Sequence, residues 1–358
     1  MRIRIPLALL LTLTIFIGTT VADPDTFSLL NQAREAAKRG DLDEALSYHR
    51  LAVDAAEESG DLAERAEAIG DLGGIFLALG RVSEAKELCL KSLALLRESK
   101  STRYLPVVLN NLGVIYKLTG NYVQSEAYLT DSLRAVRAFP RPDPYEARVL
   151  NNLGAFYYEM KDLGKAEKAF KKAISIFEKQ LGQDPAELSL FLSNLGGVYI
   201  LRKKWDSAAP LLDRALLLVE QSPLPSNLLL AGVLDNLGMM HRFRKNFVES
   251  EKFLRKAYAL RLGLLGPEHP LVVVTGVKLA GTLRDSGRYE DAERLYSEAL
   301  AIYEKTSRVH TVDAAMTLEE LAHLFRQTSR GRNAEPLEAR AKAIRFDLEN
   351  TVSAASLR

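Results

Sequence analysis

The chain has 358 residues, of which 47% are hydrophobic and 26% charged, so its composition is that of a folded protein and excludes a chain dominated by disorder. Its formal net charge of +2 is too small for a protein whose main partner is nucleic acid, because phosphate binding needs a basic face. The single cysteine, Cys89, excludes an internal disulfide.

The N-terminus has the pattern of a signal peptide over residues 1–22. Arg2 and Arg4 give it a basic start, and the segment that follows is apolar apart from two threonines and a proline. Small residues then stand at Thr20 and Ala22, which is the pattern read by a signal peptidase. We therefore expect cleavage after Ala22 and an exported protein, either periplasmic or secreted.

A membrane anchor is the alternative for this segment. The apolar run is shorter than the roughly 18–20 residues that a spanning helix needs, which favours cleavage over an anchor formed by residues 5–22. The mature chain would begin at Asp23 and would contain 46 basic and 46 acidic residues. We expect contact with a membrane only if the N-terminal segment is retained.

A repeat of 40 to 42 residues organises the rest of the chain. The sequence LNNLG occurs at Leu109 and again at Leu150. Its glycine belongs to a column, called here the anchor column, that contains only Gly or Ala in eight successive repeats. The anchor column is Ala33, Gly73, Gly113, Gly154, Gly196, Gly238, Ala280 and Ala322.

Other columns keep the same spacing. The positions twelve and nineteen residues after the anchor are Ala or Ser in every repeat, and the position sixteen residues after it is mostly large. The position seven residues after it, called here the turn column, is glycine in four repeats. We interpret each repeat as two helices, A and B, that approach closely at the small residues and turn at the glycine. The large residues are expected to fill the gap between one pair and the next.

These columns resemble the tetratricopeptide repeat. The resemblance rests on L-G-x-x-Y at Leu112, Gly113 and Tyr116, and on A-x-x-x-F at Ala166 and Phe170. The repeat is longer than the 34 residues common in that family, and is similar to the long-repeat class found in kinesin light chain.

The resemblance implies an all-α protein, a right-handed α-solenoid of about eight helix pairs. The solenoid is expected over residues 23–345, with a C-terminal cap helix or tail over 346–358. It also implies a concave groove, lined by helices A, that binds a peptide or a protein segment.

No residue pattern indicates catalysis, a metal or a cofactor. The five histidines form no metal-binding pair of the H-x-x-x-H type, and Cys89 falls in the column of large core residues. Sequence motifs for an activated serine, a phosphate loop or a dinucleotide site are missing as well. We therefore expect a protein that is not an enzyme and needs no cofactor. An enzyme with a cryptic site in the groove is the alternative.

The column two residues before the anchor predicts the binding site. It is asparagine in five of eight repeats, although asparagine costs roughly half a kcal/mol relative to alanine inside a helix. An amide both donates and accepts, so it can pair with an extended backbone of any sequence. We predict a ladder of these amides above an apolar floor. The ladder is Asn111, Asn152, Asn194 and Asn236, and the floor includes Tyr158, Leu201, Met239 and Phe243.

The predicted function is an exported, non-enzymatic scaffold that captures a protein or peptide in the concave groove. Two alternatives stay open. The protein could be a structural component of an envelope or secretion assembly that binds through its convex face or its ends. The asparagines could also bond each other or water and only shape the superhelix.

Overall fold

The computed structural model describes residues 25–140, 143–179, 185–222, 227–306 and 308–356, and the regular secondary structure in these ranges is α-helical throughout. The predicted signal peptide and its cleavage site after Ala22 lie outside the described residues. Within the described ranges, no helix combines the length and the apolar character needed to cross a membrane.

Sixteen helices follow one another in this part of the chain. They are α1 (Thr26–Arg39), α2 (Leu42–Ser59), α3 (Leu62–Ala78), α4 (Val82–Ser99), α5 (Leu105–Leu118), α6 (Tyr122–Arg137), α7 (Tyr145–Glu159), α8 (Leu163–Glu178), α9 (Pro185–Leu201), α10 (Trp205–Glu220), α11 (Asn227–Phe243), α12 (Phe247–Leu265), α13 (Pro270–Asp285), α14 (Tyr289–Lys305), α15 (Val312–Gln327) and α16 (Gly331–Ser356).

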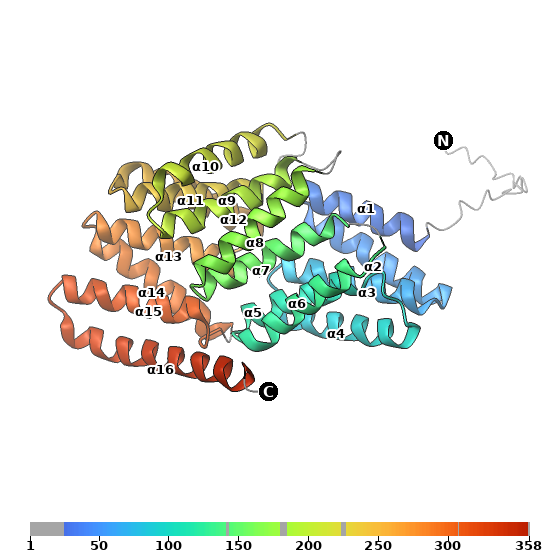
Figure 1. Cartoon of the computed structure of the whole chain (residues 1–358). Helices are drawn as coiled ribbons and strands as arrows, with labels where there is room; N and C mark the ends of the chain where they lie inside the picture. The colour runs from blue at the N-terminus through green and yellow to red at the C-terminus, as the bar shows by residue number, and fades with distance from the viewer. Residues whose placement is uncertain (1–24, 141–142, 180–184, 223–226, 307, 357–358) are drawn as a thin grey trace, which may run out of the picture.

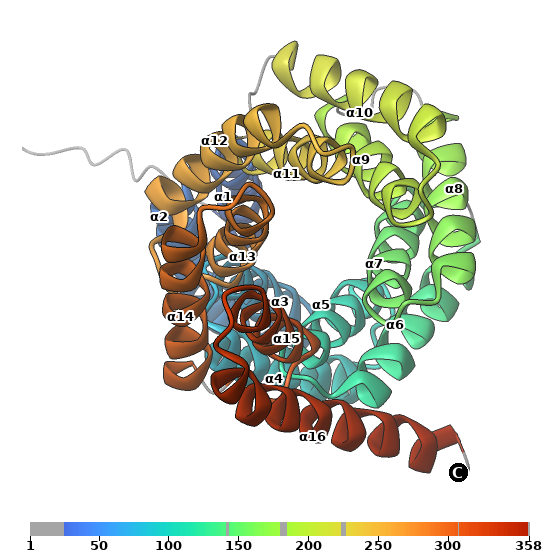
Figure 2. The same cartoon turned by 90° about the vertical axis from the view of Figure 1, so that its left-hand side faces the viewer.

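The helices form eight pairs, and the odd-numbered member of each pair is helix A (Figure 1). In the view of Figure 2 the pairs follow a ring, with α5, α7, α9, α11 and α13 on its inner side and α6, α8, α10, α12 and α14 on its outer side. The predicted all-α, right-handed solenoid of eight helix pairs is confirmed. Helices A therefore form the inner face of the superhelix, as the resemblance implied.

The anchor glycines explain how closely helices A and B approach. A Cβ atom at Gly113 would lie 2.6 Å from Cγ of Leu129, and one at Gly154 would lie 2.7 Å from the ring of Phe170. Leu129 and Phe170 are the large residues sixteen positions after these anchors. They also pack in clusters with apolar residues of the next pair, Leu129 with Leu153 of α7 and Phe170 with Leu195 of α9, so they fill the gap between successive pairs as expected. The anchor is small because the large residue of helix B lies directly over it.

Serine in the small columns ties helix B to helix A. The hydroxyl of Ser125 donates to the carbonyl oxygen of Gly113 at 2.8 Å, and that of Ser132 donates to Pro106 at 2.7 Å. Both serines are fully buried. Because a buried hydroxyl must be hydrogen-bonded, serine replaces alanine here without leaving an unpaired polar group.

The turn column adopts the left-handed conformation in every repeat. The glycines of this column include Gly80 and Gly120, with φ of 74° and 77°. In other repeats the position is Lys161, Lys203 or Lys245, with φ between 58° and 63°. Lysine therefore accepts the same backbone at a modest cost, and glycine is not required by the turn alone.

The C-terminal end differs from the expectation of a separate cap. Helix α16 runs without a break from Gly331 to Ser356, so helix B of the eighth pair and the predicted cap are one helix. Glu338, which occupies a core column, instead accepts two hydrogen bonds from Arg326, both at 2.6 Å. A charged residue is acceptable there because its side chain is 42% exposed and forms an ion pair with Arg326.

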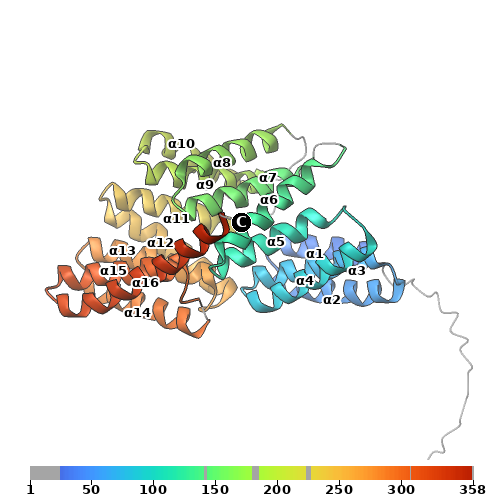
Figure 3. The same ribbon diagram turned by 60° about the horizontal axis from the view of Figure 1, so that its bottom comes forward.

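The superhelix closes on itself. The loop before α13 contacts the turn between α3 and α4, where Nε2 of His269 bonds with the carbonyl oxygen of Ala78 at 3.0 Å. One pair further on, the backbone N–H of Val312 donates to the hydroxyl of Tyr122 at 3.0 Å. Figures 1 and 3 show the C-terminal end of α16 beside α6, and these two helices are in contact. We call the contact of the seventh and eighth pairs with the second, third and fourth pairs the seam.

Candidate functional site

The asparagine column forms hydrogen bonds between successive repeats. Nδ2 of Asn152 donates to Oδ1 of Asn110 at 2.9 Å, and Nδ2 of Asn194 donates to Oδ1 of Asn151 at the same distance. The next member, Asn236, donates to Ser193 of the preceding repeat. These three ladder amides thus use their N–H groups to reach back by one repeat.

The acceptors occupy the column directly before the ladder, which the sequence analysis did not single out. Asn110 and Asn151 are each 5% exposed, so these amides are buried at the interface of two helices A. The doubled asparagine in LNNLG was the available signal. Its first residue is the buried acceptor for the following repeat, and its second is the half-buried ladder residue.

The pattern continues with charged residues at the seventh pair. Lys278 occupies the ladder column, and its Nζ lies 3.0 Å from Oδ2 of Asp235, which occupies the acceptor column. Burial alone would raise the pKa of Asp235, but Lys278 and Arg261 hold that pKa below its usual range. A salt bridge therefore replaces the amide pair, and the donor is again the ladder residue and the acceptor the residue of the preceding repeat.

Asn111 is the exception among the predicted ladder residues. The preceding repeat has Gly70 in the acceptor column, which offers no side chain. Asn111 packs instead against Gly74, where a Cβ atom would lie 3.3 Å from its Nδ2. Among the described residues, its amide makes no hydrogen bond, so both its N–H and its carbonyl groups are available to a ligand.

The predicted floor residues do not form one surface: three are half-buried, and the fourth is exposed at a turn. Tyr158 is half-buried beside the core of the fourth to sixth pairs, and burial raises the pKa of its hydroxyl to about 12. Leu201 and Met239 are also half-buried. Phe243 is 44% exposed and lies at the end of α11, where its ring stacks on Trp205 with 6.3 Å between ring centroids. The structure therefore places Phe243 at the turn between helices, beside the first residue of α10.

Charged residues follow the ladder towards the ends of helices A. Nζ of Lys117 lies 2.9 Å from Oε2 of Glu159, and the hydroxyl of Tyr122 donates to Oε1 of Glu159 at 3.1 Å. Burial lowers the pKa of the Lys117 ammonium, but the carboxylates of Glu159 and Asp313 raise it above its usual value overall. Lys117 is not among the predicted ladder or floor residues.

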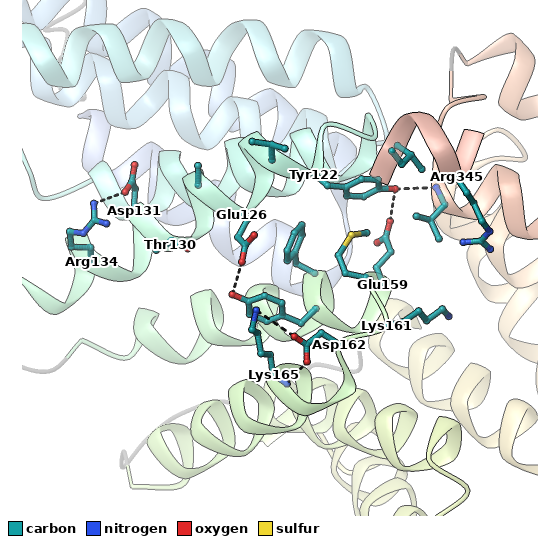
Figure 4. Close-up of a pocket in the computed structure, with 17 residues that line it drawn as sticks. Tyr122, Glu126, Thr130, Asp131, Arg134, Glu159, Lys161, Asp162, Lys165 and Arg345 are labelled. Carbon is teal, nitrogen blue, oxygen red and sulfur yellow. Dashed lines mark hydrogen bonds and ion pairs between the residues drawn. The ribbon is translucent and has the colours of Figure 1, made fainter. Parts of the chain in front are cut away.

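A cleft of roughly 1080 Å³ lies next to this group, between α6, the end of α7 and the C-terminal half of α16 (Figure 4). Tyr122, Phe156 and Val312 supply apolar lining, and Lys161 and Arg345 supply charge. None of the predicted ladder or floor residues lines it. The cleft follows the outer helix α6, so it is separate from the ladder.

Comparisons with known proteins agree with this geometry. The family model described as tetratricopeptide repeat matches residues 104–179, 187–263 and 229–305. The Arabidopsis thaliana protein KINESIN LIGHT CHAIN-RELATED 1 is 28% identical over 153 residues, which are 41% of this chain and 25% of that protein. The chain thus spans about a quarter of this curated relative.

Two solved structures are also similar. A Rap protein complexed with Competence and Sporulation Factor has 14% identity and a TM-score of 0.64, over 91% of this chain and 99% of that one. BtubC (BKLC) from P. vanneervenii has 19% identity and a TM-score of 0.45, over 67% of this chain and 92% of that one. The likeness to the Rap protein shows the fold. The family model matches more than half of the chain, and the chain belongs to the tetratricopeptide-repeat family, with long repeats like those of kinesin light chain.

Proposed function

We propose that this tetratricopeptide-repeat protein is a non-enzymatic scaffold that binds an extended segment of a partner protein along the inner face of its superhelix. In this function the inner face binds the segment and catalyses no reaction. It places the segment along the ladder of Asn111, Asn152, Asn194 and Asn236.

The observation that carries the proposal is the state of the ladder amides. The N–H groups of Asn152 and Asn194 bond to the preceding repeat, which fixes their orientation. Their carbonyl oxygens make no hydrogen bond within the described residues and are half-buried rather than fully solvated. Oriented acceptors can receive the backbone N–H groups of an extended segment, and Asn111 can also donate. The geometry thus supports a ladder made mainly of acceptors, instead of amides that both donate and accept.

Two further observations support this proposal. The Rap protein of similar fold was solved in complex with another molecule, Competence and Sporulation Factor. The most exposed large apolar side chains in the described ranges are Val248, Phe27 and Phe346, and they lie on three different helices and form no common patch. Single exposed apolar residues are common on soluble proteins and mark no interface.

Asn111→Ala gives a clean test, because this amide makes no bond that folding needs. We would select a phage-displayed library of random twelve-residue peptides on the purified protein and measure the affinity of each selected peptide by titration calorimetry. Each net hydrogen bond contributes about 0.5–1.5 kcal/mol, so Asn111→Ala should weaken binding by roughly tenfold. The matched control is Asn333→Ala on α16, which should leave the affinity unchanged. Selected peptides that bind both variants and the parent equally would place the binding site elsewhere.

We also propose that the protein is exported and acts in the periplasm or outside the cell. The support is the sequence pattern of residues 1–22 described above. Protein isolated from its native host should begin at Asp23, which N-terminal sequencing would show. A product that keeps Met1 and sediments with membranes would establish the anchor instead.

A further inference from the structure

The seam joins segments about 190 positions apart in the sequence. Besides the bond between His269 and Ala78, Nε of Arg308 donates to the carbonyl oxygen of Leu118 at 3.4 Å. An apolar cluster also crosses the seam, in which Val312 packs with Tyr122 and Phe156. These contacts combine buried hydrogen bonds with apolar packing, so the seam is a built interface and the two ends do not merely touch.

Two turn glycines are fitted to the seam. A Cβ atom at Gly80 would lie 2.7 Å from the ring of His269, and one at Gly120 would lie 2.3 Å from the carbonyl oxygen of His310. The equivalent glycines Gly40 and Gly287 would meet nothing within 4 Å. Other repeats accept lysine in this column, so close approach across the seam explains glycine at the second and third pairs.

Tyr122 connects the seam to the inner face. Its hydroxyl oxygen accepts the backbone N–H of Val312, and its hydroxyl hydrogen is donated to Glu159 (Figure 4). Glu159 in turn pairs with Lys117. A chain of three polar contacts, of 3.0, 3.1 and 2.9 Å, therefore runs from the start of α15 to the ladder side of α5 and α7.

The charges around this chain face each other across the seam. Glu159 is the last residue of α7, in the fourth pair. Asp313, the residue after Val312, belongs to α15, in the eighth pair. Burial raises the pKa of Asp313, the carboxylate of Glu159 raises it further, and Arg308, Lys117 and Lys278 oppose this rise. Nη2 of Arg308 lies 3.6 Å from Oδ2 of Asp313, so these two residues at the start of the eighth pair form an ion pair with each other. Lys117 and Lys161 both interact with the two carboxylates, and of these two Lys117 forms the ion pair with Glu159.

We propose that the seam is a latch held from the inner face by Lys117, which screens Glu159 from Asp313 and so keeps the eighth pair closed on the third and fourth pairs. Loss of the Lys117 charge leaves two like charges facing each other in a partly desolvated place, which opens the seam. A ligand that draws Lys117 away has the same effect, and this coupling rests on the proposed function. The latch itself does not depend on any ligand.

Hydrogen exchange on the full chain tests the latch without a partner. The exchange rate of the backbone N–H of Val312 reports directly on the seam, because this N–H donates across it to the hydroxyl of Tyr122. In Lys117→Met we expect it to exchange at least tenfold faster, while the amides of α9 to α11 keep their protection. The matched control is Lys91→Met on α4, an exposed lysine away from the seam. The double variant Lys117→Met with Asp313→Asn should recover most of the protection, because it removes one of the two facing charges.

A second pair of variants separates the latch from a general loss of folding. Gly120→Ala and Gly40→Ala impose the same backbone strain, but only the first introduces a side chain into the seam. Small-angle scattering should show a larger radius of gyration for Gly120→Ala than for the parent, and Val312 should exchange faster in this variant. Gly40→Ala should match the parent in both measurements. The latch is overturned if Lys117→Met exchanges like Lys91→Met, or if the Asp313→Asn change restores nothing. Failure of peptide binding to the ladder would refute the proposed function and leave these results unaffected.

Discussion

Gly113 shows that this fold depends on positions where the residue has no side chain. The helix pair closes because Leu129 of helix B occupies the space above this glycine. The sequence predicted that the anchor is small, since eight repeats agree on it. It could not predict which large residue lies over the anchor, because helical spacing alone does not fix how two helices are rotated against each other.

Gly113→Ala should therefore destabilise the protein although alanine is the better helix former. The new methyl group would lie 2.6 Å from Leu129, and overpacking of this kind costs about 1–3 kcal/mol. Gly263→Ala on α12 is the matched control, because a Cβ atom there meets nothing within 4 Å. It should stabilise the protein by about 0.5–1 kcal/mol. Urea unfolding of both variants measures the difference, and two shifts of the same sign would contradict this packing.

His269 makes stability depend on pH. Its Nδ1 accepts the N–H of Leu271, so the tautomer assigned from these partners carries hydrogen on Nε2 and donates it to Ala78. Burial lowers the pKa of His269 to about 4, with smaller contributions from Arg308 and Arg261 in the same direction, against the bond to Ala78. The folded protein thus keeps the ring neutral at a pH where the unfolded chain already protonates it.

The sign of the effect follows from this lowered pKa. Between the unfolded value of about 6.5 and the folded value of about 4, the unfolded state binds more protons, so stability falls as the pH falls through this window. His269→Asn keeps an N-cap side chain but does not titrate. Urea unfolding at pH 7 and pH 4.5 should show that the parent loses about 1–3 kcal/mol more than this variant. The exposed His323 gives the control His323→Asn, which should keep the parent's pH dependence.

At the scale of the helices, the asparagine ladder was predictable and its hydrogen bonds were not. The periodic sequence places Asn152 and Asn194 at equivalent positions of helices A. Whether their N–H groups point to a ligand or to the preceding repeat depends on the offset between neighbouring helices, and periodicity carries no information on that offset. Asn110 was therefore overlooked as an acceptor, although the doubled asparagine marks it.

This geometry changes the expected result of removing the ladder amides. Helix propensity alone predicts that the double variant Asn152→Ala with Asn194→Ala folds as well as the parent or better. The structure predicts the opposite, because Asn110 and Asn151 would each be left as buried acceptors without a donor. Each loss costs about 1–3 kcal/mol, and the gain in helix propensity of roughly 0.5 kcal/mol per residue does not offset it.

The urea midpoint of the double variant should therefore fall clearly below that of the parent. Asn333→Ala, on the exposed side of α16, should leave the midpoint within about 0.5 kcal/mol of the parent. A double variant as stable as the parent would show that these interrepeat bonds contribute nothing in solution.

At the scale of the whole molecule, the sequence predicted eight pairs but not the seam. The repeat period specifies each pair and its contact with the next one. Small changes in the angle between pairs accumulate, and they decide whether the seventh pair meets the second or passes it by. The residues that meet at the seam, among them Gly80, Gly120 and His269, stand in turn and loop positions that the repeat already contains. Read one repeat at a time, these residues indicate only turns and loops.

Closure predicts a different unfolding behaviour from that of an open solenoid. In an open array each repeat contacts only its neighbours, so the end repeats open first and the opening spreads inwards. Here α15 near one end packs on α6 and α7, and Arg308, just before α15, bonds to Leu118 at the end of α5, so the eighth pair cannot open without breaking the seam. Native-state hydrogen exchange at increasing urea should find α13 and α15 opening in one step with α3 and α5, at a free energy well above that of α1 and α2.

The first pair supplies the internal comparison for this prediction, because Gly40 of its turn has nothing within 4 Å of a Cβ atom. Within the described residues its contacts with other pairs are mainly those with the second pair, so its amides should exchange through local opening at low urea. In Gly120→Ala, which strains the seam, the amides of α15 should lose their link to α5 and open at a free energy close to that of α1. If α15 already opens independently of α5 in the parent protein, the ends of the superhelix are not coupled, and the contacts of the seam contribute too little to hold the ring closed.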